Sequence, residues 1–460
     1  MEVRRGMYPI RRKGDQMLNQ LFARVRVLFR GLSGNGQSRL PDPLRIASQA
    51  GQAPRPRTVA PPAPPRVVSP EQRAERTRAL AIRLFGANQP VDNPRDLFGR
   101  QAELTALREA VLDGGMHAVI YGPRGSGKTS LVRVFGTMAD ERGATIIYLS
   151  CAGSGDFGQI ILPYLHEMGP APFGLRADEF ARAVDLVSSS PTPRSVAALL
   201  ARANRDELVL ILDEFDRLED ADTKAQLALL IKLLADMRSR VRLVFVGISG
   251  DVGELIDVHA SVRRHLTAVG LKPISDVEVA NFIRSTSSAI GVAIAPGALA
   301  ALRFVACGSP YHMRLFSLQS CLAAIDGGGR EVDEPTMLAG LERARRVWSA
   351  TNSRDAALFE AALADPRWPV AILECFAREC AVRLEFTPAD LADALERDGF
   401  DPDAAPLLIE AFGPALGRMK EGSLRLAFDD VLAPQFLLSM CVTARMTASG
   451  HPVSSEGTMQ

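Results

Sequence analysis

Short apolar runs alternate with helical patterns between residues 93 and 272. The runs are almost uninterrupted stretches of hydrophobic residues, at 117–121, 144–149, 207–212 and 241–246. Strands of a parallel sheet are covered by helices on both faces, so they have this continuous pattern rather than an alternating one. Helical patterns separate the runs, for example at 224–237. Residues 91–272 are therefore predicted to form an α/β unit, with a parallel sheet that has helices on both faces.

The pattern becomes entirely helical from about residue 275. Apolar positions at helical spacing predict helices at 275–289, 296–306, 310–325 and 333–350. A smaller unit follows, with helical stretches at 355–364, 368–380, 387–397 and 404–417 and an extended segment at 423–428. The sequence thus predicts an all-helical domain at 273–352 and a small helix-rich domain at 353–445. The polar residues 446–460 are predicted to be a disordered tail.

The first 90 residues have a different character. Nine prolines fall in residues 41–70, and so many prolines prevent a regular helix or a packed core. Residues 16–32 carry apolar side chains at helical spacing, together with three arginines. We expect residues 1–90 to be a basic, largely disordered leader with an amphipathic helix at 16–32. Residues 16–32 could be a short docking helix or part of an unstructured leader, or they could contact an acidic membrane surface, a partner or nucleic acid.

Composition and charge narrow the class of protein. The 460 residues are 47% hydrophobic and 23% charged, as is ordinary for soluble globular proteins. No uninterrupted apolar run approaches the roughly 18 residues of a membrane-spanning helix, and no signal-peptide pattern precedes the folded part, so we expect a cytoplasmic protein. Residues 1–70 hold 13 Lys+Arg and 3 Asp+Glu, although the net charge of the chain is only +1. A basic leader is therefore attached to an acidic body.

The clearest chemistry follows the first predicted strand. Residues Gly122 to Thr129 fit the pattern G-x-x-x-x-G-K-[ST], between a strand that ends at Tyr121 and a predicted helix at 128–141. The glycines let the backbone fold tightly and bring its N–H groups to phosphates, and the positive end of the helix adds to the attraction. Lys128 supplies a charge for the outer phosphates, and the Thr129 hydroxyl group is placed to coordinate Mg²⁺.

This pattern predicts a site for a nucleoside triphosphate, which we take to be ATP with Mg²⁺. The residues expected to bind the nucleotide are those of the loop and the first turn of the helix: Gly122, Pro123, Arg124, Gly125, Ser126, Gly127, Lys128, Thr129 and Ser130.

Two carboxylates form the second part of the predicted site. The apolar run at 208–212 ends in Asp213 and Glu214, 85 residues after Lys128. In a parallel sheet this strand end lies near the phosphate loop, at the edge where such folds bind ligands. We expect Asp213 to hold Mg²⁺, directly or through water, and Glu214 to orient and activate the attacking water. Lys128 and Glu214 are thus the predicted catalytic residues, and Thr129 and Asp213 the predicted metal ligands.

Two further segments resemble a known family. The segment from Leu97 to Glu103 contains Phe98-Gly99-Arg100 and is similar to the one that opens the ATPase module of STAND and Orc/Cdc6-like AAA+ proteins. Gly308-Ser-Pro310 is similar to the Gly-x-Pro of the STAND helical lid. The resemblance covers residues 93–350, over half of the chain. It implies that residues 273–352 form a lid over the nucleotide. It also implies that four residues of the two segments line the site: Phe98, Gly99, Arg100 and Pro310.

The chain departs from the family pattern in several places. After the fourth strand STAND proteins often carry a Thr/Ser-Arg pair, whereas this stretch has Ser249 but no arginine. Ser249 could still sense the γ-phosphate. Arg263 and Arg264 stand where AAA+ relatives place an arginine finger that acts on a neighbouring subunit, although a solvated helix end would look the same. Arg314 stands where a lid arginine could reach the phosphates, or it is an ordinary lid residue. The sequence shows no internal repeats of the kind in which STAND proteins usually end.

Residues 353–445 resemble the winged-helix domain of Orc/Cdc6-like relatives, with 423–428 as the wing strand. In initiator relatives that domain binds DNA. Here the domain holds 9 Lys+Arg and 16 Asp+Glu, whereas non-specific DNA affinity comes from basic residues that neutralise phosphates. We therefore favour a domain that contacts protein or inhibits the ATPase. If DNA is bound, the basic leader suits it better.

The leading hypothesis from the sequence is an ATP-driven switch with slow, Mg²⁺-dependent ATPase activity. ATP would close the lid and change how the C-terminal domain or a neighbouring subunit is presented, and hydrolysis would reset it. Its expected partners are ATP and ADP, other copies of the chain in a nucleotide-dependent way, and a protein at the C-terminal domain. One alternative is a DNA-transaction ATPase, similar to an initiator or a transposition regulator. Another is a nucleotide-binding scaffold that never hydrolyses ATP.

Overall fold

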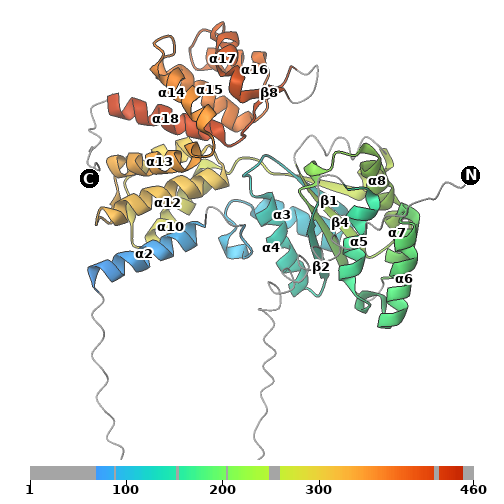
Figure 1. The fold of residues 1–460 in the computed structure, drawn as a ribbon. Helices are drawn as coiled ribbons and strands as arrows, with labels where there is room; N and C mark the ends of the chain where they lie inside the picture. The colour runs from blue at the N-terminus through green and yellow to red at the C-terminus, as the bar shows by residue number, and fades with distance from the viewer. Residues whose placement is uncertain are drawn as a thin grey trace, which may run out of the picture. The chain divides into compact units, whose positions relative to one another are not determined.

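The computed structural model describes residues 69–86, 90–151, 155–203, 206–247, 260–418 and 424–448 (Figure 1). Ser249, the amphipathic helix expected at 16–32 and most of the predicted tail lie outside these residues. Within them, a parallel sheet flanked by helices is followed by a mainly helical part. The predicted α/β fold class is therefore confirmed. None of the helices in the described part of the chain is long and apolar enough to cross a membrane.

A five-stranded parallel sheet forms the centre of the first part. Its strands are β1 (His117–Tyr121), β2 (Thr145–Ser150), β3 (Leu208–Asp213), β4 (Val241–Gly247) and β5 (Leu266–Gly270). They lie in the order β2-β3-β4-β1-β5, so all of their carboxyl ends meet at one edge. The sequence pattern did not indicate β5. This edge strand is only partly buried and therefore lacks the continuous apolar pattern of the inner strands.

Helices cover both faces of this sheet. One layer contains α3 (Gln101–Arg108) and α4 (Lys128–Glu141); the other contains α5 (Phe157–Met168), α6 (Ala177–Ser189), α7 (Pro193–Leu200) and α8 (Ala221–Asp236). Successive strand residues point to opposite faces, so Ile211 packs in the cluster that includes α4, whereas Leu210 and Leu212 pack in the cluster that includes α5 to α8. Two separate hydrophobic layers thus hold the sheet and fix its carboxyl edge.

The segment 273–352, expected to be a lid and named so from that expectation, has its helices where the sequence predicts them. They are α10 (Asp276–Ala289), α11 (Pro296–Ala306), α12 (Pro310–Asp326) and α13 (Glu334–Ser349). Local signals account for the agreement. Ser275 caps α10 in a capping box with Glu278, and proline stands at the first position of α11 and α12, where its missing N–H has no partner to lose.

The C-terminal domain follows the predicted order with two corrections. It contains α14 (Ser353–Ala364), α15 (Val370–Arg383), α16 (Pro388–Arg397), α17 (Ala404–Phe412), the antiparallel pair β8 (Leu416–Arg418) and β9 (Leu426–Phe428), and α18 (Ala433–Ala448). The helix predicted to reach 417 ends at Phe412, before Gly413-Pro414. The sequence pattern missed α18, because its residues 433–442 are buried all round and show no polar face. That this domain is a winged helix stays a prediction.

Lid and C-terminal domain share one hydrophobic core. Trp348 of α13 stacks between two rings of the C-terminal domain, Phe359 at 5.6 Å and Phe436 at 4.7 Å between ring centroids. Its indole Nε1 donates a hydrogen bond to Asp430 Oδ2 at 2.9 Å. The sheet has its own separate clusters. The lid and the C-terminal domain therefore pack as one body, and the sheet domain is joined to it.

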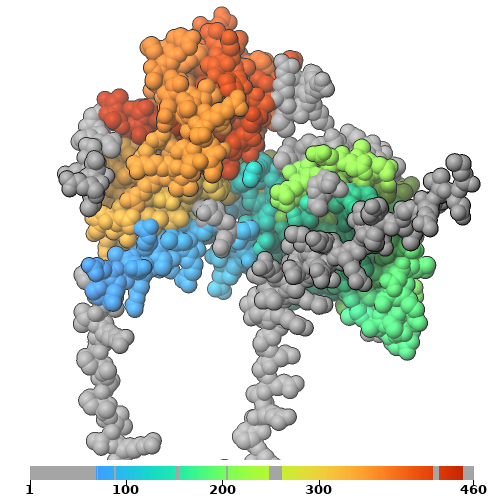
Figure 2. Space-filling view, viewed as in Figure 1, coloured from blue at the N-terminus to red at the C-terminus, as the bar shows by residue number. Residues whose placement is uncertain are grey.

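Residues 70–85 correct the predicted extent of the leader. We expected residues 1–90 to be largely disordered, but Pro70–Phe85 form helix α2, which lies along the lid (Figure 2). Ser69 and Gln72 form a capping box at its start, Ala81 and Phe85 are buried in the lid core, and Arg78 pairs with Asp326 at 2.6 Å. Helix α2 is polar on average. Its narrow apolar stripe is buried only because it packs on α12, which lies far away in the sequence.

His312 is a buried titratable group in the core shared by the lid and the C-terminal domain. It lies in the first turn of α12, with its ring 5.3 Å from that of Phe316 and 5.3 Å from that of Phe436. Its Nδ1 lies 2.9 Å from Ser309 Oγ. Burial lowers the pKa of His312 to about 3, so the folded protein excludes a proton that the unfolded chain binds below about pH 6.5.

The stability that His312 contributes should therefore be complete above about pH 6.5 and decline as the pH falls toward 3, by about 1.4 kcal/mol per pH unit. His312→Phe keeps an aromatic ring but removes the titration. Between about pH 7 and pH 5, we expect its free energy of unfolding in urea to fall by roughly 2 kcal/mol less than that of the unmodified chain. His166→Gln, at an exposed position, should keep the original pH dependence. An unchanged pH profile in His312→Phe would contradict this account.

Candidate functional site

The phosphate-loop pattern and the Asp213-Glu214 pair meet at the carboxyl edge of the sheet. The loop follows β1, and Asp213 ends β3, with β4 between these two strands. The Thr129 hydroxyl group crosses this gap and donates a hydrogen bond to Asp213 Oδ2 at 3.0 Å. The two predicted metal ligands are therefore neighbours, as the parallel topology requires.

The loop has the backbone that its glycines allow. Gly125 and Gly127 have φ angles of +79° and +91°, a region that other residues rarely enter. Gly127 is the N-cap of α4 and has no side chain to satisfy the first N–H groups of that helix. Those N–H groups face the loop, and the positive end of the helix dipole adds to their field. An anion is the natural partner of this arrangement.

Lys128 lies against the backbone of the loop. Its Nζ donates hydrogen bonds to the carbonyl oxygens of Gly122 at 2.7 Å and Pro123 at 2.9 Å. Burial lowers the pKa of Lys128, while the carboxylates of Asp216 and Asp213 act in the opposite direction. The ammonium group is thus held at the mouth of the loop and within the field of the two acids.

Asp213 is only 4% exposed, and both of its carboxylate oxygens are engaged. Oδ1 accepts a hydrogen bond from the backbone N–H of Glu214 at 2.8 Å. Oδ2 accepts from the hydroxyl groups of Thr129 and Tyr148. A buried carboxylate needs such partners, because an unpaired one would be very costly. Sequence reasoning missed Tyr148, because its bond to Asp213 depends on which strand lies beside β3 and in which register.

Glu214 follows in a left-handed backbone conformation, with a φ of +55°. Such a conformation costs a non-glycine residue of order 1 kcal/mol or more. The Ser150 hydroxyl group donates a hydrogen bond to Oε2 of Glu214, and Arg217 pairs with Oε1 at 3.0 Å. Ser150 stands opposite Asp213 in the sheet register. The structure therefore adds Ser150 and Arg217 to the residues that surround the two acids.

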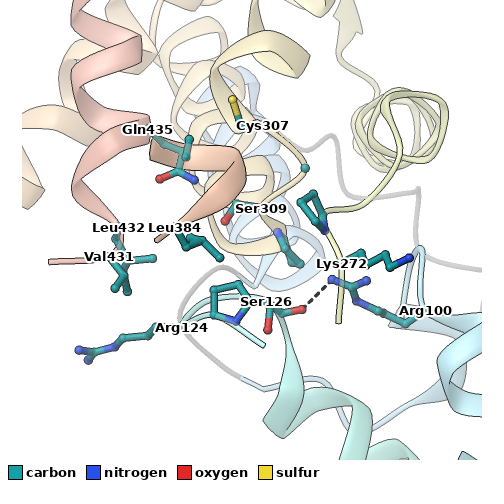
Figure 3. Close-up of a pocket in the computed structure, with 15 residues that line it drawn as sticks. Arg100, Arg124, Ser126, Lys272, Cys307, Ser309, Leu384, Val431, Leu432 and Gln435 are labelled. Carbon is teal, nitrogen blue, oxygen red and sulfur yellow. Dashed lines mark hydrogen bonds between the residues drawn. The ribbon is translucent and has the colours of Figure 1, made fainter. Parts of the chain in front are cut away.

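Arg100 fastens the opening segment to the loop. The side chain is buried, and its guanidinium group donates a hydrogen bond to the Ser126 carbonyl oxygen at 3.0 Å (Figure 3). It also donates to Glu103 Oε1 at 3.0 Å. Burial lowers the pKa of Arg100 and Glu103 counteracts the shift. The role of Arg100 in this geometry is to hold the loop backbone. The acid three positions later in the motif is its partner.

The two motif glycines pack on the same residue, Ile274, at the connection between sheet domain and lid. A Cβ atom at Gly99 would lie 2.7 Å from the Ile274 side chain, and one at Gly308 would lie 2.5 Å from the Ile274 carbonyl oxygen. Ile274 N–H also donates to the Gly308 carbonyl oxygen at 2.8 Å. Both glycines have positive φ angles. Close packing at this connection thus explains both motifs in physical terms.

Of the other predicted residues of the nucleotide site, Ser130 and Pro310 lie beside the loop, whereas Phe98 packs on the lid. Phe98 contacts Phe282 of the lid, with 4.9 Å between ring centroids. Ser130 Oγ accepts a hydrogen bond from Val91 N–H at 3.1 Å. Pro310, the first residue of α12, lies 3.9 Å from the position that a Cβ atom would take at Gly127. The start of the lid helix therefore borders the loop.

Three predicted sensor residues lie elsewhere. The Arg314 guanidinium group donates to the carbonyl oxygens of Phe85 and Asp96, both at 2.8 Å, so the lid uses it to hold the segment that precedes the motif. Arg263 and Arg264 are exposed and immediately precede β5. They thus lie at the opposite edge of the sheet from the loop. Any contact with phosphate would have to be made on a neighbouring copy of the chain.

The C-terminal domain also reaches the loop. Leu432 lies between β9 and α18, and one of its methyl groups is 3.0 Å from the position that a Cβ atom would take at Gly125. A cavity of about 30 Å³ lies here (Figure 3). Its walls come from the loop, the lid and the C-terminal domain, and they include Ser126, Ser309 and Gln435. A cavity of this size holds a water molecule but not a nucleotide.

The residues present fit a nucleotide with a magnesium ion. The glycine loop, the helix start and Lys128 suit phosphate oxygens. Thr129 and Asp213 offer a hydroxyl and a carboxylate oxygen, which are the hard ligands that Mg²⁺ prefers. These two residues would hold the ion.

Comparisons with known proteins agree with the geometry. A model of the AAA ATPase domain family matches residues 96–246, about a third of the chain. No curated protein sequence matches this chain. Among solved structures, a Walker-type ATPase of Pyrococcus abyssi has 17% identity and a TM-score of 0.47, with 77% of this chain and 99% of that chain covered.

Two further structures are similar at the same low level. Cdc6p from Pyrobaculum aerophilum has 14% identity and a TM-score of 0.43, with 80% of this chain and 99% of that chain covered. The Aeropyrum pernix ORC1 protein, solved in complex with DNA, has 16% identity and a TM-score of 0.38, with 76% and 94% covered. Similarities this distant assign no function, and the STAND subtype stays a prediction. The family match and the site geometry rest on the same residues: residues 96–246, which match the AAA ATPase domain family, carry the phosphate loop, Asp213 and Glu214.

Proposed function

We propose that this protein is an ATP-binding switch that hydrolyses ATP slowly with Mg²⁺ and uses the nucleotide to control the placement of its lid and C-terminal domain. One observation carries the proposal: Leu432 of the C-terminal domain packs on Gly125 of the phosphate loop. An anion-binding loop and a separate domain therefore share a contact. A change in the conformation of the loop must therefore change the contact that this domain makes.

The chain supplies each part of the chemistry that hydrolysis needs. ATP bound with Mg²⁺ would bring the phosphoryl group and the charge that offsets its oxygens. The Lys128 ammonium group would leave the carbonyl oxygens of Gly122 and Pro123 and donate to phosphate oxygens instead. Glu214 would accept a hydrogen bond from the attacking water and orient it. To do so its carboxylate would exchange the partners Ser150 and Arg217 for that water.

Packing explains how a nucleotide could move the C-terminal domain. The lid and that domain share a continuous core, in which Trp348 of the lid lies between Phe359 and Phe436. A lid that moves therefore carries the C-terminal domain with it. Pro310 and Leu432 border the loop from this single body. A ligand that binds one arrangement of the two bodies more tightly than the other will shift the balance between them.

Charge favours a protein over DNA as the partner of the C-terminal domain. Asp393, Glu396, Asp401 and Asp403 are all exposed. A phosphate backbone would be repelled by these carboxylates, and little Lys or Arg is available to release its counterions. Self-association is the other proposed readout. Arg263 and Arg264, exposed at the sheet edge away from their own loop, are placed to reach the site of a neighbouring copy.

The first prediction concerns Glu214. Glu214→Gln should bind ATP as tightly as the unmodified chain but lose at least about tenfold in turnover, since the amide is a poor acceptor for the proton of water. Lys128→Ala should lose ATP binding itself. Glu219→Gln, an exposed acid nearby, is the matched control and should behave like the unmodified chain. Radiolabelled ATP binding and phosphate release measure the two effects. Equal, measurable turnover in Glu214→Gln and the unmodified chain would contradict the catalytic role of Glu214, and no phosphate release from either would mean that the protein is a scaffold and not an ATPase.

The second prediction concerns Leu432. Leu432→Ala removes most of the contact with Gly125, which is worth about 1 kcal/mol for a partly buried leucine. We expect a fluorescent ADP analogue to leave the variant roughly fivefold faster, because the C-terminal domain no longer braces the loop. Leu424→Ala, in the same domain at a position that is 77% exposed, is the control. Identical release rates for Leu432→Ala and the unmodified chain would remove the proposed coupling.

The third prediction concerns assembly. If Arg263 and Arg264 serve a neighbouring copy, the chain should form larger particles with ATP than with ADP or without nucleotide, as seen by light scattering after size exclusion. Arg263→Ala with Arg264→Ala should lower turnover without weakening ATP binding. The same measurement with added duplex DNA separates the alternatives: a DNA-transaction ATPase would bind it in an ATP-dependent way that weakens steeply with salt. A monomer in every nucleotide state would exclude the intersubunit role.

A further inference from the structure

Tyr148 places a phenol beside the acid that ends the neighbouring strand. It lies on β2, directly opposite Ile211 of β3 in the register, so Asp213 is its diagonal neighbour two residues further along. Residues two apart on a strand share a face, and Ile211 faces α4, so Asp213 faces it too. An aromatic side chain is long enough to reach a diagonal neighbour. The Tyr148 hydroxyl group donates a hydrogen bond to Asp213 Oδ2.

The ring of Tyr148 is held in place from the other side. Arg133 lies one helical turn after Thr129 on α4, and its guanidinium carbon is 5.3 Å from the centroid of the Tyr148 ring. A guanidinium group over an aromatic face is attractive and fixes the ring. Tyr148 therefore touches both elements that carry the predicted metal ligands: α4, which carries Thr129, and β3, which carries Asp213.

The hydrogen bonds on Asp213 leave room for one more partner. An ionised carboxylate offers about four acceptor positions. The Glu214 N–H, the Thr129 hydroxyl group and the Tyr148 hydroxyl group occupy three of them. A phenol carries its proton at neutral pH, so the Tyr148 hydroxyl group acts as the donor in this hydrogen bond. The orientation of the carboxylate is thereby fixed before any ligand arrives.

We propose that Tyr148 is a positioning residue for the divalent cation: its hydroxyl group holds the Asp213 carboxylate facing the Thr129 hydroxyl group, so that the two form a prepared pair. This inference rests on the proposed function, because it assigns Tyr148 to the magnesium ion of that same site. Tyr148 itself does not touch the ion or the nucleotide. Its loss should therefore change the requirement for Mg²⁺ and not the affinity of the loop for phosphate.

Tyr148→Phe tests this, because it removes one hydroxyl group and keeps the ring beneath Arg133. The full-length chain is titrated with Mg²⁺ in the presence of a fluorescent ATP analogue, and binding of the analogue is also measured in EDTA. We expect the Mg²⁺ concentration for half-maximal binding to rise roughly 3- to 10-fold, the effect of one lost hydrogen bond to a metal-holding carboxylate. Binding in EDTA should be unchanged.

Tyr164→Phe is the matched control. The Tyr164 hydroxyl group is buried and also donates to β3, at the Ile211 carbonyl oxygen at 2.6 Å, but it makes no contact with the carboxylate. The Tyr164→Phe substitution should lower the melting temperature and leave the Mg²⁺ requirement unchanged. If Tyr148→Phe weakens binding equally with Mg²⁺ and in EDTA, or if Tyr164→Phe raises the Mg²⁺ requirement as much, Tyr148 is a structural residue and the proposal is overturned.

The same titration separates this proposal from the function on which it rests. An unmodified chain that binds no analogue, or binds it without regard to Mg²⁺, overturns the proposed function together with the role of Tyr148. An unmodified chain that requires Mg²⁺, beside a Tyr148→Phe variant with the same requirement, overturns the role of Tyr148 alone.

Discussion

A carboxylate can end a buried strand only where its oxygens find hydrogen-bond donors. In this protein that constraint falls on Asp213, and the rest of the structure depends on it. Its partners come from three places: the following residue, the helix that follows the phosphate loop, and the neighbouring strand β2. The donors can converge only if the strands are parallel and end at one edge. The sheet order, with β4 between β1 and β3, sets the gap that Thr129 has to cross. The cost of leaving the acid unpaired thereby ties the loop to the sheet.

The second constraint lies where two bodies meet. The sheet domain has its own hydrophobic layers, whereas the lid and the C-terminal domain share another core. Between them the chain passes through Ile274, which is packed against Gly99 on one side and Gly308 on the other. Side chains at either glycine would push the two bodies apart. The glycines of the two short motifs that resemble AAA+ proteins thus have a structural role, because they permit close contact between the two bodies beside the loop.

In the proposed switch, this arrangement would let a bound nucleotide affect residues far from the loop. Leu432 touches the loop from the C-terminal domain, and Arg314 holds the carbonyl oxygens of Phe85 and Asp96 from the lid. A small shift at the loop is passed on because packed interfaces have few alternative arrangements. Helix α2, packed on α12, would follow the lid as well. The proposed switch therefore needs no long pathway, only two bodies and their shared border.

The sequence by itself determined the features that depend on neighbouring residues. The continuous apolar runs predicted the inner strands, local caps and prolines predicted the lid helices, and the glycine pattern with Lys128 and Thr129 predicted the phosphate loop. Only the tertiary structure decided what depends on residues far apart in the chain. Helix α2 needed α12 to bury its stripe, α18 had no polar face to reveal it, and Tyr148 gained its partner Asp213 through strand register. Arg314 stands where a lid arginine could reach the phosphates, or is an ordinary lid residue, and its charged guanidinium group donates to two backbone carbonyl oxygens far away in the chain. Local sequence patterns encode helices, strands and loops, whereas tertiary packing decides which group a long polar side chain bonds to.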